Sequence, residues 1–278
     1  ACRGMKAGLL LAEALSASGA DPRDVSLLLA ELLDCQPLEL PLLRDRELDA
    51  GVVQKFWEYH ARLLRNEPPQ YILGKSWFFG LELEVGPAVL IPRPETEGLV
   101  ELALKHVQPG SRVLEIGTGS GAIAIVLKKH WPAFVISATD SSLEALAVAK
   151  RNAARHGCAI DFQLGDLFPT GEGRFDLIIS NPPYVSASEY ADVEPRVRDF
   201  EPSGALLAAE EGLQYYRRIL EGAASRLAEQ GLVFFEHGAF QRGGITALAE
   251  GLGFAVIQAG QDLSGRDRYL VLQVKPEI

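Results

Sequence analysis

The sequence of 278 residues has few cysteines and lacks the features that carry a chain into or across a membrane. Its three cysteines are Cys2, Cys35 and Cys158, which are widely spaced and form no C-x-x-C pair, and this argues against a disulfide framework and a zinc site. No apolar run approaches the roughly 20 residues that span a bilayer, and the first residues show no signal-peptide pattern. We therefore expect a cytoplasmic protein without a metal site.

Positive charge is scarce relative to negative charge. Lys and Arg number 27 against 37 Asp and Glu, which gives a formal net charge of −10 at pH 7. Such a chain repels a polyanion unless its basic residues are gathered into one patch. We therefore expect no direct nucleic-acid substrate. The 47% of hydrophobic residues is enough for one large core and a smaller one, which favours two domains.

The sequence pattern changes twice along the chain. Residues 5–65 carry apolar side chains at helical spacing and predict a small helical domain, which we expect to begin at Met5, the only methionine, after residues 1–4. Helices should stop at the two prolines within residues 66–69. Residues 66–90 are then expected to form a linker and a β-hairpin. Residues 91–278 remain for the main domain.

Strands and helices alternate from Arg112 onward. We expect strands near 112–116, 134–139, 160–164, 175–180 and 231–236, with helices near 121–130, 142–156 and 211–229. A further helix is expected near 241–252, with strands near 254–258 and 268–274. This alternation is typical of an α/β fold with a mostly parallel, doubly wound sheet, whose ligands bind at the carboxyl ends of the strands.

A glycine-rich loop, Glu115-Ile116-Gly117-Thr118-Gly119-Ser120-Gly121, joins the first of these strands to its helix. Glycines allow a tight turn and a close approach of the backbone to a ligand. Asp140 ends the next expected strand, where a carboxylate can accept hydrogen bonds from ribose hydroxyls or cap the following helix. Both features fit a nicotinamide dinucleotide as well as other nucleoside cofactors.

A second pair of residues, Asp166 and Phe168, follows the third expected strand. An acid and an aromatic ring at this edge can contact the amino group and the face of an adenine. A place in the hydrophobic core is an equally good interpretation of Phe168.

The tetrapeptide Asn181-Pro182-Pro183-Tyr184 directly follows the strand expected at 175–180. A planar amide or exocyclic amine is a poor nucleophile because its lone pair is delocalised, so a catalyst must orient its two N–H groups with two acceptors. The Asn181 side-chain oxygen and the Pro182 carbonyl can be those acceptors, and Tyr184 can stack on the planar group. Together with the glycine loop and Asp140, this favours methyl transfer to nitrogen over nicotinamide chemistry.

With these motifs the sequence resembles the HemK family, the N5-glutamine methyltransferases that modify the Gly-Gly-Gln loop of peptide chain release factors. Other family-like segments are residues 69–74, residues 90–97 and Phe200-Glu201-Pro202, and the resemblance extends over about residues 66–274. Many methyltransferases share the glycine loop, and enzymes acting on adenine or guanine share versions of the tetrapeptide. Ile91-Pro92-Arg93-Pro94-Glu95-Thr96-Glu97 points most narrowly to this family.

The resemblance implies a Rossmann-like, seven-stranded class I methyltransferase domain in residues 91–278, preceded by the small helical domain and the hairpin. It implies S-adenosylmethionine as cofactor, S-adenosylhomocysteine as product and class 1 release factors as partners, which the helices of residues 5–65 would help to grip. The implied cofactor contacts are Glu115, Gly117, Thr118, Gly119, Ser120, Gly121, Asp140, Asp166, Phe168 and Asn181. The implied catalytic residues are Asn181, Pro182 and Tyr184, and Pro183 joins them in binding substrate.

Alternatives remain at this point. An amino-methyltransferase acting on adenine N6 or guanine N2 would use the same tetrapeptide but should carry a basic groove. A binding module with an inactive fold is a third hypothesis, although the intact site residues give no reason for inactivity. We assign no role to Glu236, which ends the strand expected at 231–236, or to Arg93 and Glu95. We interpret the charged residues between 192 and 199 as a solvated loop.

Overall fold

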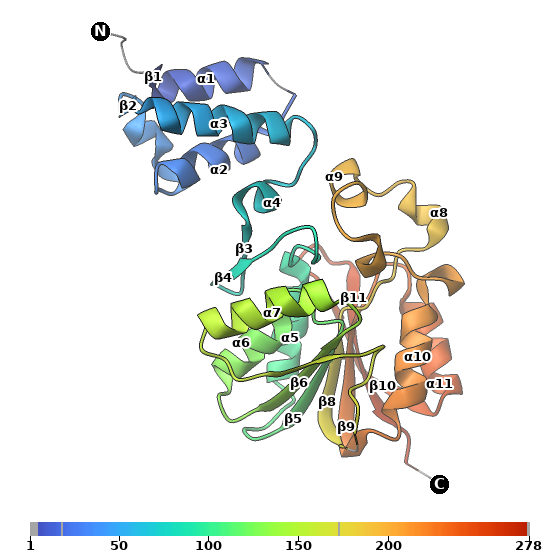
Figure 1. Cartoon of the computed structure of the whole chain (residues 1–278). Coiled ribbons are helices and arrows are strands. Elements are labelled where there is room, and N and C mark those ends of the chain that lie inside the picture. Colours follow the sequence, from blue (N-terminus) through green and yellow to red (C-terminus); the bar gives the residue numbers. More distant parts are fainter. Residues whose placement is uncertain (1–4, 18, 172, 277–278) are drawn as a thin grey trace. The chain divides into compact units, whose positions relative to one another are not determined.

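The computed structural model describes residues 5–17, 19–171 and 173–276 and divides into two compact units (Figure 1). Unit 1 contains the chain up to Gly74 together with Pro195–Phe200. Unit 2 contains Lys75–Glu194 and the chain from Glu201 onward. Cys2 and the other residues of the segment 1–4 lie outside the described residues.

Unit 1 is a small helical bundle. It contains β1 (Met5–Lys6), α1 (Ala7–Ala17), α2 (Pro22–Leu32), η1 (Pro37–Leu43), β2 (Glu47–Leu48), α3 (Ala50–Leu63) and α4 (Pro69–Leu73). The start of α2 shows why the chain turns here: Asp21 accepts a hydrogen bond from the backbone N–H of Arg23, and Pro22 occupies the first helical position. Apolar side chains at helical spacing, among them Leu10, Leu29 and Phe56, then form one core.

One local expectation for unit 1 was wrong. The prolines at 68 and 69 do not end the helical region, because α4 begins at Pro69. Proline is accepted at the first helical position, where the backbone N–H has no partner within the helix in any case. Gly74 ends α4 with a left-handed φ of 72°, and the hairpin follows directly.

Unit 1 also includes a segment that is distant in sequence. Helix α9 (Pro195–Arg198) belongs to it, and the Arg196 guanidinium forms an ion pair with Asp24 of α2 at 2.9 Å. The charged loop that we interpreted as merely solvated therefore has a defined packing partner.

Unit 2 contains a seven-stranded sheet in the order β10-β11-β9-β8-β5-β6-β7. The strands are β5 (Arg112–Ile116), β6 (Val135–Asp140), β7 (Asp161–Leu164), β8 (Phe175–Ser180), β9 (Leu227–Glu236), β10 (Phe254–Gln261) and β11 (Asp267–Val274). The five strands from β9 to β7 are parallel, while β11 is antiparallel to β9 and β10 is antiparallel to β11. The predicted α/β fold with a mostly parallel sheet is confirmed.

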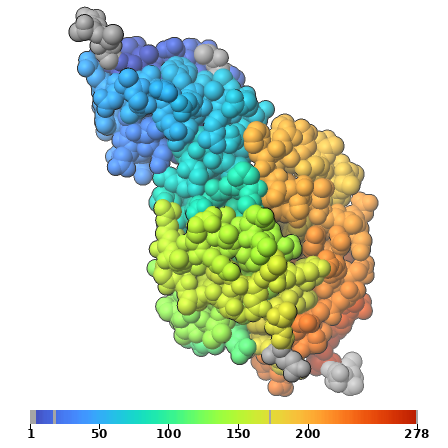
Figure 2. Space-filling model, in the orientation of Figure 1, coloured from blue at the N-terminus to red at the C-terminus, as the bar shows by residue number. Residues whose placement is uncertain are grey.

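Successive residues of the central strands face opposite sides of the sheet, as the period of a strand requires. Val113 and Leu177 pack into one core with α5 (Pro94–Leu104), α6 (Ala122–His130) and α7 (Leu143–Arg155). Their neighbours Leu114 and Ile178 pack into a second core with α10 (Gln214–Ala223) and α11 (Arg242–Gly251). Figure 1 shows these two groups of helices on opposite sides of the strands, and in Figure 2 the residues around α6 and α7, light green to yellow-green, cover one face of unit 2.

The remaining elements of unit 2 are short. The expected hairpin is formed by β3 (Lys75–Phe78) and β4 (Leu81–Glu84), which are antiparallel. After the sheet strand β8 come α8 (Ala187–Tyr190), η2 (Ser203–Ala205) and η3 (Glu210–Gly212). In the part of the chain that the structure describes, no helix has the length and hydropathy needed to cross a membrane.

The helix expected at 211–229 was too long. It is replaced by α10, which ends at Ala223, and β9 already begins at Leu227. The segment after Ala223 is rich in good helix formers, but Leu227 pairs with Phe175 of β8. Sheet pairing thus overrides the local helix propensity.

Candidate active site

A pocket of about 230 Å³ lies in unit 2 at the carboxyl ends of β5, β6 and β8. Strand ends of this kind form the ligand crevice of doubly wound sheets, at the point where the strand order reverses. Seven of the predicted site residues line it: Gly117, Gly119, Asp140, Asp166, Asn181, Pro182 and Pro183. The structure therefore brings the glycine loop, the second strand end and the tetrapeptide to one cavity.

The glycine loop turns sharply between β5 and α6. Gly117 and Gly119 have φ angles of 73° and 53°, in the left-handed region that favours glycine. The backbone N–H groups of Gly117 and Thr118 both donate to the carbonyl of Thr139, at 2.9 and 3.0 Å, which ties the loop to β6. No atom lies within 4 Å of a Cβ built on Gly117 or Gly119. A side chain at either position would therefore project into open space beside the pocket.

Asp140 ends β6 and holds the loop in place. Its carboxylate accepts hydrogen bonds from the backbone N–H of Gly119 at 2.8 Å and of Ser142 at 2.9 Å. A carboxylate offers about four lone-pair positions, so these two contacts leave acceptor capacity on the pocket side. The side chain both fixes the loop and faces the cavity.

Glu115 lies beneath the loop and does not line the pocket. Its side chain is 1% exposed and accepts hydrogen bonds from the Thr118 hydroxyl at 2.6 Å and the backbone N–H of Ala124 at 3.2 Å. Burial raises the pKa of this carboxyl to about 8, although the two hydrogen bonds oppose the shift. Thr118, Ser120 and Gly121 likewise shape the turn without reaching the pocket wall.

The tetrapeptide begins where β8 ends. The Ser180 hydroxyl donates to the carbonyl of Ile116 at 2.8 Å, which joins β8 to β5 just before the site. The side-chain N–H of Asn181 donates to the hydroxyl of Thr96, on α5, at 3.2 Å. Within the described residues, the Asn181 side-chain oxygen and the Pro182 carbonyl receive no hydrogen bond. Two acceptors therefore stand unused beside the pocket.

A buried carboxylate stands behind Asn181. Glu236 at the end of β9 is 1% exposed, and its Oε2 atom has no hydrogen-bond partner within the described residues. Burial raises the pKa of Glu236 to about 7, against hydrogen bonds from Thr96 and Asn181 and the charge of Arg268. Sequence reasoning had placed Glu236 at this edge but gave it no contact with Asn181.

Tyr184 is held by two residues that follow β9, Gly238 and Gln241. The Gln241 side chain donates to the Tyr184 carbonyl at 2.8 Å and accepts from the backbone N–H of Gly238 at 3.0 Å. Burial raises the pKa of the Tyr184 hydroxyl to about 12, so the phenol stays neutral. Tyr184 does not itself line the cavity.

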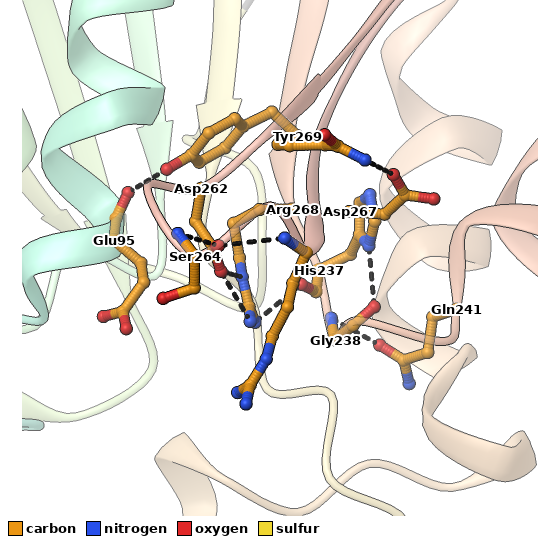
Figure 3. A network of polar contacts seen from close by, with 11 residues as sticks. Glu95, His237, Gly238, Gln241, Asp262, Ser264, Asp267, Arg268 and Tyr269 are labelled. Atoms are coloured by element: carbon orange, nitrogen blue, oxygen red, sulfur yellow. Dashed lines mark hydrogen bonds and ion pairs between the residues drawn. The ribbon is translucent and has the colours of Figure 1, made fainter.

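The same network continues into the hairpin of β10 and β11. Arg268 donates to the carbonyl of His237 at 3.1 Å and forms an ion pair with Asp262 at 3.2 Å (Figure 3). The Tyr269 hydroxyl donates to the carbonyl of Glu95 at 2.5 Å, as Figure 3 also shows. These contacts fasten the start of α5 and the loop after β9 to the sheet.

The motif at residues 91–97 follows the pocket-lining residues 88–90 in sequence and does not itself line the cavity. Glu201, which is buried, accepts hydrogen bonds from the backbone N–H of Ile91 at 3.0 Å and from the Arg93 guanidinium at 2.6 Å. Leu90 and Pro202, which flank these residues, both line the pocket. Arg93 therefore acts as a partner of Glu201 that holds two wall segments together.

Two predicted cofactor contacts are placed differently from the rest. Asp166 lines the pocket but is exposed and forms an ion pair with Arg218 at 2.7 Å. The Phe168 ring does not line the pocket: it lies 4.5 Å from the Arg226 guanidinium and fills the space where Gly222 has no side chain.

Several pocket residues were missed by sequence reasoning. Leu167 and Tyr215 supply apolar and aromatic surface, and Ser142 adds polar surface next to Asp140. Ser142 carried a usable signal, because it is the N-cap of α7 and follows the predicted strand end. Tyr215 carried none, since it is distant in sequence from every motif.

Comparison with known proteins agrees with this geometry. The PrmC N-terminal domain family matches residues 9–74, and the Methyltransferase small domain family matches residues 96–199. A methyltransferase structure from Pyrococcus furiosus has a TM-score of 0.56 at 23% identity, covering 79% of this chain and 99% of that one, which shows a common fold.

Curated relatives are closer in sequence. A release factor glutamine methyltransferase of Cereibacter sphaeroides is 40% identical over 258 residues, which are 91% of this chain and 92% of the relative. One from Thermodesulfovibrio yellowstonii is 40% identical over 218 residues, or 76% of this chain and 78% of the relative. The chain belongs to the release factor glutamine methyltransferase family.

Proposed function

We propose that this protein transfers a methyl group from S-adenosylmethionine to the side-chain amide nitrogen of the glutamine in the Gly-Gly-Gln motif of class 1 peptide chain release factors. The observation that carries the proposal is the position of Asn181 and Pro182, whose free acceptors stand beside the pocket that the glycine loop and Asp140 also line. The family membership predicted from the sequence is confirmed by the relatives.

The pocket residues fit the proposed cofactor. Open space beside Gly117 and Gly119 admits a ligand close to the backbone. The spare lone pairs of Asp140 suit ribose hydroxyls, and Leu167 and Tyr215 offer apolar surface for a planar base. When bound, S-adenosylmethionine would supply an electrophilic methyl group on a positively charged sulfur: the C–S bond breaks as the N–C bond forms, neutral S-adenosylhomocysteine leaves, and the amide nitrogen loses one of its two protons.

The chain's own residues orient the nucleophile. The Asn181 side-chain oxygen and the Pro182 carbonyl accept the two N–H groups of the substrate amide, which fixes the rotation of the amide and turns the face of its nitrogen toward the methyl donor. Tyr184 ends the tetrapeptide and stays neutral, and its ring is proposed to stack on the planar amide of the bound substrate. Correct orientation of this kind is worth up to roughly 7–11 kcal/mol in favourable cases.

The base-methylating alternative has less support. The relatives that match most of the chain carry a name that specifies glutamine of a release factor. The net charge of −10 also opposes the capture of a nucleic acid. We place the reaction in the cytoplasm, where a protein of the translation apparatus is the substrate.

The test is a transfer assay with methyl-labelled S-adenosylmethionine. Separate reactions should contain release factor, its variant with the Gly-Gly-Gln glutamine replaced by alanine, and total RNA or DNA. We expect label on that glutamine alone, located by mass spectrometry. Label on nucleic acid, or label that persists in the alanine variant, would overturn the proposal.

A further inference from the structure

The orientation of one side-chain amide decides whether the proposed site can work. Asn181 is useful to a substrate amide only if its oxygen, not its NH₂ group, faces that amide, and the two ends of the carboxamide are nearly equal in size. Something in the protein must therefore distinguish the two orientations. The inference below rests on the proposed role of Asn181 in glutamine methylation.

The structure contains a short hydrogen-bonded chain behind Asn181. The Asn181 NH₂ group donates to the Thr96 hydroxyl oxygen at 3.2 Å, and the side chains of both Thr96 and Asn181 interact with the Glu236 carboxylate as hydrogen-bond donors. Both Thr96 and Glu236 are buried, at 5% and 1% exposure, so water does not compete for these groups. Three elements meet here: α5, the end of β8 and the end of β9.

The charge of Glu236 determines which group donates each hydrogen bond in this network. An ionised carboxylate can only accept hydrogen bonds, so the Thr96 hydroxyl must give its single hydrogen to Glu236. The Thr96 oxygen is then left as an acceptor, which only the NH₂ end of Asn181 can satisfy. We propose that Glu236, acting on Asn181 directly and through Thr96, is a positioning residue that locks the Asn181 amide with its oxygen toward the substrate.

The incomplete pairing of Glu236 supports a functional role. A buried carboxylate with one unpartnered oxygen is costly to desolvate, and a fully paired or apolar side chain would be more favourable for stability. The titratable and charged groups that face it are Glu95 on α5, Tyr184 after β8, Tyr216 on α10, and Arg268 and Tyr269 on β11. Arg268 is the group among these that favours the ionised form.

Glu236→Gln is the informative substitution because it keeps the shape of the side chain. A glutamine NH₂ can donate to the Thr96 oxygen, which frees the Thr96 hydroxyl to donate to the oxygen of Asn181 and reverse its amide. Protonation of Glu236 would have the same effect. The donor and acceptor roles of Thr96 and Asn181 therefore depend on the charge at position 236.

The experiment measures methyl transfer to intact release factor by the full-length protein and its variants across pH 6 to 9. We expect Glu236→Gln to lower kcat roughly 10–100-fold, the usual range for a residue that orients a direct contact, with binding of S-adenosylmethionine within about threefold of the parent. In the parent, kcat should fall as the pH drops below about 7, because Glu236 becomes protonated. This acidic limb should be absent in Glu236→Gln.

Three variants give the controls. Glu229→Gln makes the same change at an exposed position near the other end of β9 and should keep parental kcat and its pH profile. Thr96→Val removes the hydroxyl at similar volume and should lower kcat as Glu236→Gln does, whereas Thr96→Ser should recover most of that loss. Unfolding midpoints of all variants exclude a general loss of structure.

The outcomes separate the inference from the proposed function. A folded Glu236→Gln protein with the kcat and acidic limb of the parent would overturn the positioning role and leave glutamine methylation standing. A parent protein that labels no release factor would instead refute the proposed function itself. Loss in Glu236→Gln and Thr96→Val, with recovery in Thr96→Ser, is the result that supports the inference.

Discussion

Two buried carboxylates stand at the same edge of the sheet and are used differently. Glu115 in β5 and Glu236 in β9 are both 1% exposed, and burial raises the pKa of both. Glu115 receives hydrogen bonds from the Thr118 hydroxyl and the Ala124 backbone within its own loop, whereas Glu236 keeps an unpartnered oxygen. Glu115 thus stabilises the glycine loop in which it lies, whereas Glu236 is proposed to position Asn181, which follows β8.

Substitutions in the two halves of the site should therefore impair different steps. Changes near the glycine loop should weaken cofactor binding, because that loop is shaped by contacts that close within residues 115–140. Changes near the tetrapeptide should lower the rate of transfer and leave cofactor binding almost intact.

The largest effect should come from Asn181→Ala. Removal of the orienting acceptor should lower kcat by about 10²–10³-fold, comparable to the loss of one preorganised polar contact in an enzyme site. Cofactor affinity, measured by titration calorimetry, should stay within about threefold. Turnover equal to that of the parent would contradict the proposed role of the tetrapeptide in methyl transfer.

Asp140→Ala should have the opposite character. The variant loses the acceptor for the Gly119 and Ser142 N–H groups and the proposed acceptor for ribose, so cofactor affinity should fall about 10–100-fold. At saturating cofactor, kcat should recover to within a few fold of the parent. A rate that stays low at saturation would show that the two halves of the site are not separable.

The pH dependence of stability should distinguish the two carboxylates. Their pKa values are raised in the folded state, to about 8 for Glu115 and about 7 for Glu236, from 4.5. The protonated form is therefore favoured by folding, and the stability that each contributes is full below pH 4.5 and is lost as the pH rises through the folded pKa. The slope reaches at most about 1.4 kcal/mol per pH unit for each group.

Urea unfolding between pH 5 and 9 tests whether the free energy of unfolding decreases as the pH rises. Glu115→Gln should flatten the loss of unfolding free energy up to about pH 8, and Glu236→Gln only up to about pH 7. Exposed Glu229→Gln serves as the reference and should keep the parental slope. Stability that increases with pH over this interval in the parent, and not in the variants, would reverse the argument.

Tyr184→Phe should have the smallest effect. The Tyr184 hydroxyl has no hydrogen bond within the described residues, and its pKa near 12 keeps it neutral, so the ring rather than the hydroxyl carries the proposed contact. We expect kcat within about threefold of the parent, whereas Tyr184→Ala should lower it clearly more. Equal losses in both variants would assign the role to the hydroxyl.

Much of the fold could be predicted because strand and helix patterns alternate regularly in the sequence of unit 2. The alternation of apolar strands with helices predicted the positions of β5, β6, β7 and β8 along the chain and a mostly parallel sheet, and the glycines marked the first turn. The prediction failed at residues 224–229, where alanine, leucine and glutamate favour a helix locally but Leu227 pairs with Phe175. Such pairing depends on a partner about 50 residues away and leaves no local trace.

The residues of the candidate site that lie at strand ends could be predicted from the sequence. Asp140 ends β6 and Asn181 directly follows β8, and both line the pocket. Phe168 stays a prediction as a cofactor contact, and its ring packs where Gly222 leaves space on α10. The link from Glu236 through Thr96 could not be predicted either, because each residue is ordinary by itself and only packing brings them together.

The ion pair between Arg196 and Asp24 has a practical consequence for dividing this protein. The PrmC N-terminal domain family ends its match at residue 74, yet six residues at 195–200 belong to the same compact unit. A fragment that begins at residue 75 would retain Arg196 without Asp24, and a fragment that ends at residue 74 would lack α9. Unit 1 consists of two segments that are distant in sequence. Domain boundaries taken from the linear sequence would therefore separate these two segments.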